Sequence, residues 1–134
     1  MKLEYNILWI DNDLQVYIDN GSIKDVEEIL TEKGFEPNVE KVFDEANLDE
    51  SINKHDYDLI ISDYNLENTT GDVIIENIRT KKKSDSEILF YTAQPESSFR
   101  DKTQVMARLW MIDRLTFHIG RENLIDKIEK VINL

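Results

Sequence analysis

Cysteine is absent from this chain of 134 residues. Its absence excludes a disulfide framework, a thiolate nucleophile and a cysteine-bound metal site. No uncharged apolar run approaches the roughly 18 residues that a membrane-spanning helix needs, and the Met-Lys-Leu-Glu start lacks the long apolar segment of a secretory signal. We therefore expect a cytoplasmic protein that does not insert into a membrane.

Glycine and proline are scarce, with four and two residues, and no stretch rich in Gly, Ser or Pro divides the chain as a linker would. No internal repeat is present either. With 40% hydrophobic and 33% charged residues, the composition is that of a soluble globular domain, long enough to fold without a metal or disulfide. The sequence predicts one domain over residues 1–134.

Negative charge is in excess, with 28 acidic and 16 basic side chains. Residues 1–68 hold 18 acidic and five basic side chains, a net of −13, whereas residues 69–134 hold ten and eleven, a net of +1. An acidic surface repels a phosphate backbone, so we expect no direct binding to nucleic acid. A cation or a basic partner is the more natural ligand, although most of these charges are expected only to solvate the surface.

Five apolar runs alternate with helical patterns. Strands are predicted at Leu3–Ile10, Phe35–Val42, Tyr57–Ser62, Glu87–Tyr91 and Leu115–His118. Helices are predicted over residues 22–33 behind a capping box at Ser22 and Asp25, over 44–54 behind an Asp44 cap, and over 71–80, 97–110 and 121–133. Residues 14–21 fit an extended loop or an extra turn. The alternation predicts a doubly wound α/β domain with a parallel sheet covered on both faces.

Sheets of this kind place their sites at the carboxyl ends of the strands. The polar residues expected there are Asp11, Asn12, Asp13, Asp63, Asn65, Thr92 and His118. Carboxylates from two adjacent strand ends repel each other unless a cation lies between them, and hard oxygen ligands suit Mg²⁺. A carboxylate beside such a metal can attack phosphorus. Asp63 is the predicted nucleophile because it directly follows the central apolar strand, and the Thr92 hydroxyl can donate to a phosphoryl oxygen.

In their order and spacing these segments resemble the receiver domain of two-component response regulators, the CheY-like family, over nearly the whole chain. Asp11 and Asn12 in ILWIDND match the acidic pair of the family. DLIISDYNLENTTG matches its phospho-acceptor segment, with Asp63 at the phosphorylated position and Gly71 eight residues beyond it. Thr92 in ILFYTAQ matches the switch Ser/Thr.

The resemblance implies a flavodoxin-like sheet with strand order 2-1-3-4-5. It also implies that Asp63 takes a phosphoryl group from a histidine kinase or a phosphotransfer protein. Mg²⁺ would be held by Asp11, Asn12, Asp63 and the backbone carbonyl of Asn65, with Asp13 as a further nearby carboxylate. Thr92 would follow the phosphoryl group and switch a surface for a downstream protein partner. The chain would then be a signalling domain and not an enzyme with a separate substrate, and it is compatible with a homodimer.

The chain also departs from the family pattern. The family has a lysine at the end of its fifth strand, whereas LTFHIG has none, so its charge would have to come from Arg114, His118 or Arg121. Asn12 is neutral where the family has an acidic residue, and Glu67 replaces the usual proline after the acceptor. These departures motivate a second hypothesis, a pseudo-receiver that binds partners without being phosphorylated.

A third hypothesis is enzymatic. Trp9-Ile-Asp-Asn-Asp13 fits the hydrophobic-Asp-x-Asp motif of haloacid-dehalogenase-type phosphatases. Asp11 would then be the nucleophile and Asp13 the general acid/base, with Thr92 as the second motif. The chain is short for that family, and this assignment leaves Asp63 and Asn65 without a role. Asp13 also fits a plain helix cap.

Overall fold

The computed structural model describes residues 3–81, 86–92, 115–119 and 123–133. Five parallel strands form one sheet in the order β2-β1-β3-β4-β5. The strands are β1 (Leu3–Ile10), β2 (Phe35–Val42), β3 (Leu59–Asp63), β4 (Glu87–Thr92) and β5 (Leu115–Ile119). This confirms the predicted parallel sheet and its strand order. The predicted helix over residues 97–110 lies outside the described residues.

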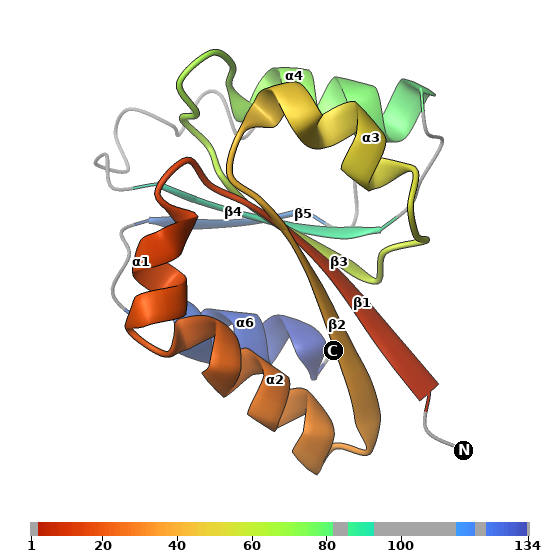
Figure 1. Ribbon diagram of the computed structural model, residues 1–134, viewed down its shortest axis with the longest axis vertical. Coiled ribbons are helices and arrows are strands. Elements are labelled where there is room, and N and C mark those ends of the chain that lie inside the picture. Colours follow the sequence, from red (N-terminus) through yellow and green to blue (C-terminus); the bar gives the residue numbers. More distant parts are fainter. Residues whose placement is uncertain (1–2, 82–85, 93–114, 120–122, 134) are drawn as a thin grey trace.

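Helices cover both faces of the sheet (Figure 1). They are α1 (Leu14–Asp19), α2 (Ser22–Glu32), the 3₁₀ turn η1 (Glu45–Asn47), α3 (Leu48–Ile52), α4 (Gly71–Glu76), the π-helical η2 (Asn77–Lys81) and α6 (Leu124–Ile132). The helices α1, α2 and α6 lie on one face, and α3 and α4 lie on the other (Figure 1). Among the described residues, none of the helices is both long and apolar enough to cross a membrane.

The two faces have separate cores because side chains of a strand point alternately to opposite sides. On β1, Ile7 and Trp9 belong to the core beneath α1, α2 and α6, whereas Leu8 and Ile10 belong to the core beneath α3 and α4. All four side chains are fully buried. A strand buried on both faces has the continuous apolar sequence from which β1 was predicted.

The local predictions around α1 and α2 need correction. Residues 14–19 form the helix α1, because Leu14 and Tyr17 find buried positions against the sheet. The capping box does not form: Gly21, with φ of +82°, is the N-cap of α2, and Ser22 is already helical. The Ser22 N–H instead donates to Asn20 Oδ1 at 2.9 Å. The Asp44 cap is confirmed, since its side chain accepts from the Ala46 N–H at 2.9 Å.

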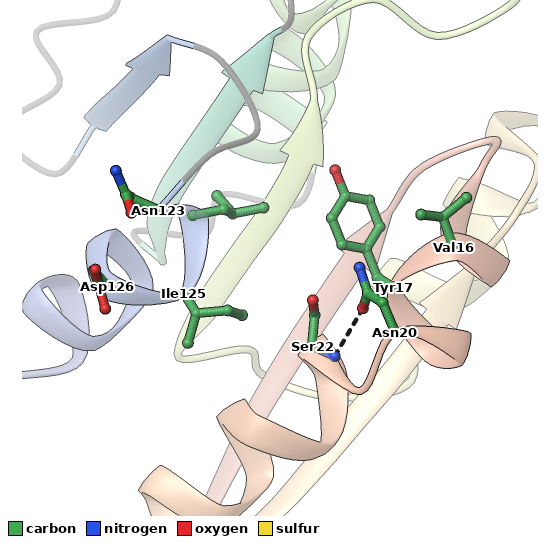
Figure 2. A pocket seen from close by; sticks show the side chains of 8 residues that line it. Val16, Tyr17, Asn20, Ser22, Asn123, Ile125 and Asp126 are labelled. Carbon is green, nitrogen blue, oxygen red and sulfur yellow. Dashed lines mark hydrogen bonds between the residues drawn. The ribbon is translucent and has the colours of Figure 1, made fainter.

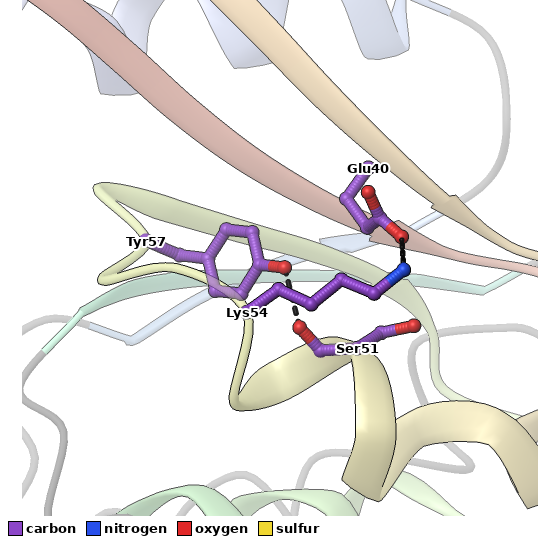
Figure 3. Close-up of polar contacts among 4 residues, drawn as sticks. All are labelled: Glu40, Ser51, Lys54 and Tyr57. Atoms are coloured by element: carbon purple, nitrogen blue, oxygen red, sulfur yellow. Dashed lines mark hydrogen bonds and ion pairs between the residues drawn. The ribbon is translucent and has the colours of Figure 1, made fainter.

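A polar contact ties α3 to the start of β3 (Figure 3). The Tyr57 hydroxyl donates to the Ser51 carbonyl at 2.6 Å, and beside it Lys54 Nζ lies 2.9 Å from Glu40 Oε1. The ion pair is exposed and adds little stability. The Tyr57 side chain is buried, and its desolvation, together with the charge of Glu40, raises the pKa of Tyr57 to about 12.

Stability should therefore fall at alkaline pH. Between the ordinary tyrosine pKa of 10.0 and about 12, Tyr57 loses its proton in the unfolded chain but keeps it in the folded chain. The free energy of unfolding should decrease across this window by about 1–2 kcal/mol, once solvent screening is allowed for. Urea unfolding at stepped pH measures this. The Tyr57→Phe protein should show a smaller decrease, and an equal decrease would contradict the assignment.

Gly71 begins α4 where its backbone touches two aromatic rings. A Cβ at this position would lie 2.7 Å from Cε2 of Tyr64 and 3.1 Å from Cε1 of Phe90. Both rings are fully buried and pack edge to face with centroids 5.8 Å apart, so neither can move aside without disturbing the core. Only glycine fits here without displacing a buried ring.

We predict that Gly71→Ala destabilises the protein by about 1–3 kcal/mol, the usual cost of overpacking a core. The matched control is Val73→Ala on the same helix, where the side chain is 46% exposed and the change should stay within about 0.5 kcal/mol. Urea unfolding of the two variants gives the comparison. Equal losses would show that the close approach to Tyr64 is not the cause.

Candidate functional site

The strand register brings Asp11 and Asp63 to the same edge of the sheet. Ile10 of β1 pairs with Ser62 of β3, so the next residues of the two strands lie side by side. Asp11 is 1% exposed and Asp63 is 9% exposed. Two carboxylates thus lie at adjacent strand ends, as the sequence predicted, and both have little access to water.

Asp11 is fixed by donors to both of its carboxylate oxygens. Oδ1 accepts from the Asp13 N–H at 2.8 Å, and Oδ2 accepts from the hydroxyl of Tyr91 on β4. That hydroxyl in turn accepts from Trp9 Nε1 at 3.1 Å. The carboxylate is therefore the end of a buried chain of hydrogen bonds that starts at the Trp9 indole.

Tyr91 stays a donor in this chain. Desolvation, then the charge of Asp11 and the hydrogen bond to it, raise the pKa of Tyr91 far above its ordinary value. The phenol therefore remains protonated and directed at Asp11. Tyr91 was not identified from the sequence as part of the site. The available signal was a tyrosine in a buried strand, because a buried tyrosine hydroxyl usually has a hydrogen-bond partner.

Asn65 connects Asp63 to the end of β4. Its N–H donates to Asp63 Oδ1 at 3.2 Å, and its Nδ2 donates to Thr92 Oγ1 at 3.4 Å. Thr92 is 1% exposed. The structure thus brings together three of the predicted site residues at the ends of β3 and β4.

Asn12 points toward the loops that follow β2 and β3. Its Nδ2 donates to the Phe43 carbonyl at 3.0 Å and to Glu45 Oε2 at 2.9 Å. Its Oδ1 accepts from the Glu67 N–H at 2.8 Å. Asn12 was predicted to bind the metal, but its amide oxygen already accepts a hydrogen bond from the backbone of Glu67.

Asp13 and His118 contribute less to the described geometry. The Asp13 side chain is exposed, and although the residue is the N-cap of α1 it makes no side-chain capping bond. The backbone of His118 pairs with Tyr91 at the end of β5, which places it at the same sheet edge. Its side chain, like Arg114 and Arg121, lies outside what the structure describes.

The oxygen atoms at this edge are of the type that Mg²⁺ prefers as ligands. Asp11 and Asp63 supply carboxylate oxygens, and the exposed residue Asn65, two positions after Asp63, supplies a backbone carbonyl. Within the described ranges, no three His, Asp or Glu side chains are grouped so as to hold a metal. Mg²⁺ is usually bound by one or two carboxylates while keeping several waters, so two carboxylates fit it.

A separate pocket of about 360 Å³ lies between α1 and the start of α6 (Figure 2). Asn123, with φ of 59°, is the N-cap of α6 on one side, and Tyr17 and Asn20 line the other side. Asn20 is held there by its bond from the Ser22 N–H (Figure 2). The lining contains none of the predicted site residues, so this pocket is distinct from the strand-end site.

We predict that Tyr91→Phe destabilises the protein by about 1–3 kcal/mol, because it leaves the buried Trp9 indole and Asp11 Oδ2 without this partner. Urea unfolding of Tyr91→Phe, Trp9→Phe and the double variant forms a double-mutant cycle. The two losses should be less than additive, since both substitutions break the same hydrogen bond. Strict additivity would argue against the chain of bonds.

Solved structures of other proteins share this fold, among them the following three. The receiver domain of HemR from Leptospira biflexa is 19% identical with a TM-score of 0.71, over 98% of this chain and 96% of that chain. CheY4, a chemotaxis response regulator of Vibrio cholerae, is 18% identical with a TM-score of 0.67, over 97% of each. The response regulator TrrA from Thermotoga maritima, in complex with Mg²⁺-BeF, is 22% identical with a TM-score of 0.64, over 96% of each. No curated protein matches the chain.

A match to a sequence family adds evidence that is independent of these structures. The family of the response regulator receiver domain matches residues 19–129, which is most of the chain. The sheet order and the strand-end cluster agree with that match. The chain therefore belongs to the response regulator receiver domain family, which is consistent with a part in two-component signalling.

Proposed function

We propose that Asp63 is the phospho-acceptor of this receiver domain. The observation that carries the proposal is that the buried carboxylates of Asp11 and Asp63 lie at adjacent strand ends, with Thr92 connected to Asp63 through Asn65. The donor would be the phosphohistidine of a histidine kinase or of a phosphotransfer protein. The phosphorylated domain would then bind or release a downstream protein partner.

In the transfer step, an oxygen of the Asp63 carboxylate attacks phosphorus. A new O–P bond forms, the P–N bond of the phosphohistidine breaks, and its electron pair returns to the imidazole nitrogen of the donor. Asp63 becomes an acyl phosphate. Its Oδ1 already accepts from the Asn65 N–H, which orients the carboxylate for attack.

Receiver domains generally bind Mg²⁺, and TrrA was observed in complex with Mg²⁺-BeF. Here the carboxylates of Asp11 and Asp63 and the carbonyl of Asn65 would hold the ion. When bound, it would neutralise the charge that spreads over the phosphoryl oxygens. The Tyr91 hydroxyl donates to Asp11 Oδ2 and so restricts the orientation of this carboxylate.

Thr92 would detect the phosphoryl group. In the unphosphorylated protein its Oγ1 accepts from Asn65 Nδ2 at the long distance of 3.4 Å. A phosphoryl oxygen on Asp63 is a stronger acceptor for the Thr92 hydroxyl than any neutral group, since charge-assisted hydrogen bonds are about twice as strong. Formation of this new bond would shift the population of the domain between two conformations with different partner-binding surfaces.

A pseudo-receiver is the second candidate, and two observations favour it. The Asn12 oxygen accepts from Glu67, so it is engaged away from the acceptor. The described residues also include no lysine at the end of β5, where the family has one. The phosphatase hypothesis has less support, because the family match is to receiver domains and the exposed Asp13 side chain makes no capping hydrogen bond to α1.

The decisive experiment is phosphorylation with acetyl phosphate and Mg²⁺, followed by the intact mass of the protein. Wild type should gain one phosphoryl group, and chelation of Mg²⁺ should abolish the gain. Asp63→Asn should gain none, whereas Asp25→Asn, which changes an exposed aspartate of α2, should gain as much as wild type.

Two results would count against the proposal. Equal phosphorylation of Asp63→Asn and wild type would place the acceptor elsewhere. A folded wild type that gains no phosphoryl group, and whose binding to a partner is unchanged by Asp63→Ala, would favour the pseudo-receiver.

A further inference from the structure

Asn12 and Glu67 are the two departures from the family pattern that flank the acceptor, and the structure joins them. Glu67 donates its backbone N–H to Asn12 Oδ1 at 2.8 Å, although the residues are 55 positions apart. A proline at position 67 has no N–H and could not make this bond. The two departures therefore belong to one interaction.

Glu45 adds a second connection between the same segments. Its Oε2 accepts from Asn12 Nδ2 at 2.9 Å, and its Oε1 accepts from the Asn68 N–H at 2.7 Å. Desolvation acts to raise the pKa of Glu45, but the hydrogen bonds from Asn12 and from Asn68 together lower it. Glu45 is therefore ionised near neutral pH, and both of its carboxylate oxygens can accept hydrogen bonds.

The bonded groups come from three different parts of the chain. Asn12 follows β1, Phe43 and Glu45 follow β2, and Glu67 with Asn68 lies in the segment of residues 64–70 that follows the acceptor. We call the side chains of Asn12 and Glu45 with these backbone partners the clasp. It fixes the backbone only a few residues beyond Asp63 and Asn65.

We propose that Asn12 is a positioning residue that, with Glu45, fastens the segment after Asp63, and that it is not a metal ligand. This rests on the proposed function, because the fastened segment carries the Asn65 carbonyl and directly follows the acceptor. The clasp holds that segment in place for phosphoryl transfer, while the metal is left to Asp11, Asp63 and the Asn65 carbonyl.

The first test is amide hydrogen exchange of the unphosphorylated protein by NMR, which needs neither metal nor phosphate. Asn12→Ala should speed exchange at Glu67 and Asn68 by about 10-fold or more, since local opening becomes easier when the bonds are lost. Asn38→Ala is the matched control, because Asn38 bonds to Asn6 elsewhere along β1 and β2. Unchanged exchange at Glu67 and Asn68 in Asn12→Ala would overturn the proposal.

The second test separates a positioning residue from a ligand by titrating Mg²⁺ into each variant in a calorimeter. Asp11→Asn should weaken Mg²⁺ binding by about 10-fold or more, whereas Asn12→Ala should change it by less than about 3-fold. Asn12→Ala should nevertheless slow phosphorylation by acetyl phosphate at saturating Mg²⁺. Loss of Mg²⁺ affinity in Asn12→Ala as large as in Asp11→Asn would make Asn12 a ligand and overturn the proposal.

Glu67→Pro gives an independent check. It removes the same N–H from the other side, so Asn12→Ala, Glu67→Pro and the double variant should slow phosphorylation to a similar extent and not additively. Additive effects would overturn the proposal. If wild type binds no Mg²⁺ and takes no phosphoryl group, the proposed function fails, and the exchange experiment still decides whether the clasp exists.

Discussion

The parallel register of β1, β3 and β4 is the constraint on which the whole site depends. Ile10 pairs with Ser62, and Ser62 pairs with Phe90, so the carboxyl ends of three strands meet at one edge. A shift of β1 or β3 by one residue would turn its aspartate to the other face of the sheet and place an apolar side chain at the site. Side-chain packing in the two separate cores opposes such a shift, because the buried side chains of β1, β3 and β4 would lose their matching neighbours. Packing remote from the site thereby fixes its geometry.

Much of this arrangement could be predicted from the sequence. The strand Phe35–Val42 has the predicted bounds, and Asp63 was found because it is the first charged residue after a fully buried run. Such predictions succeed because a strand buried on both faces has a continuous apolar sequence, and the polar residue at its end marks the sheet edge. The family resemblance then assigned a role to each strand end.

The remainder depends on contacts between distant parts of the chain. The helix α1 has no strong local signal, and it forms because Leu14 and Tyr17 are buried against the sheet. The bond from Tyr91 to Asp11 spans 80 positions, and the bond from Glu67 to Asn12 spans 55. The periodicity of a sequence does not predict which side chain accepts a hydrogen bond from a given donor. The departures at Asn12 and Glu67 were visible in the sequence, but their connection was not.

The clasp also accounts for the neutral residue at position 12. Asn12 Nδ2 lies 2.9 Å from Glu45 Oε2, and an aspartate there would bring a second carboxylate within hydrogen-bonding distance of Glu45. Two carboxylates so close repel each other unless one takes up a proton or a cation joins them. An amide instead donates to Glu45 and still accepts from Glu67. The neutral Asn12 departs from the family pattern, but it can form hydrogen bonds with both Glu45 and Glu67. An aspartate at this position could not do so without repelling Glu45.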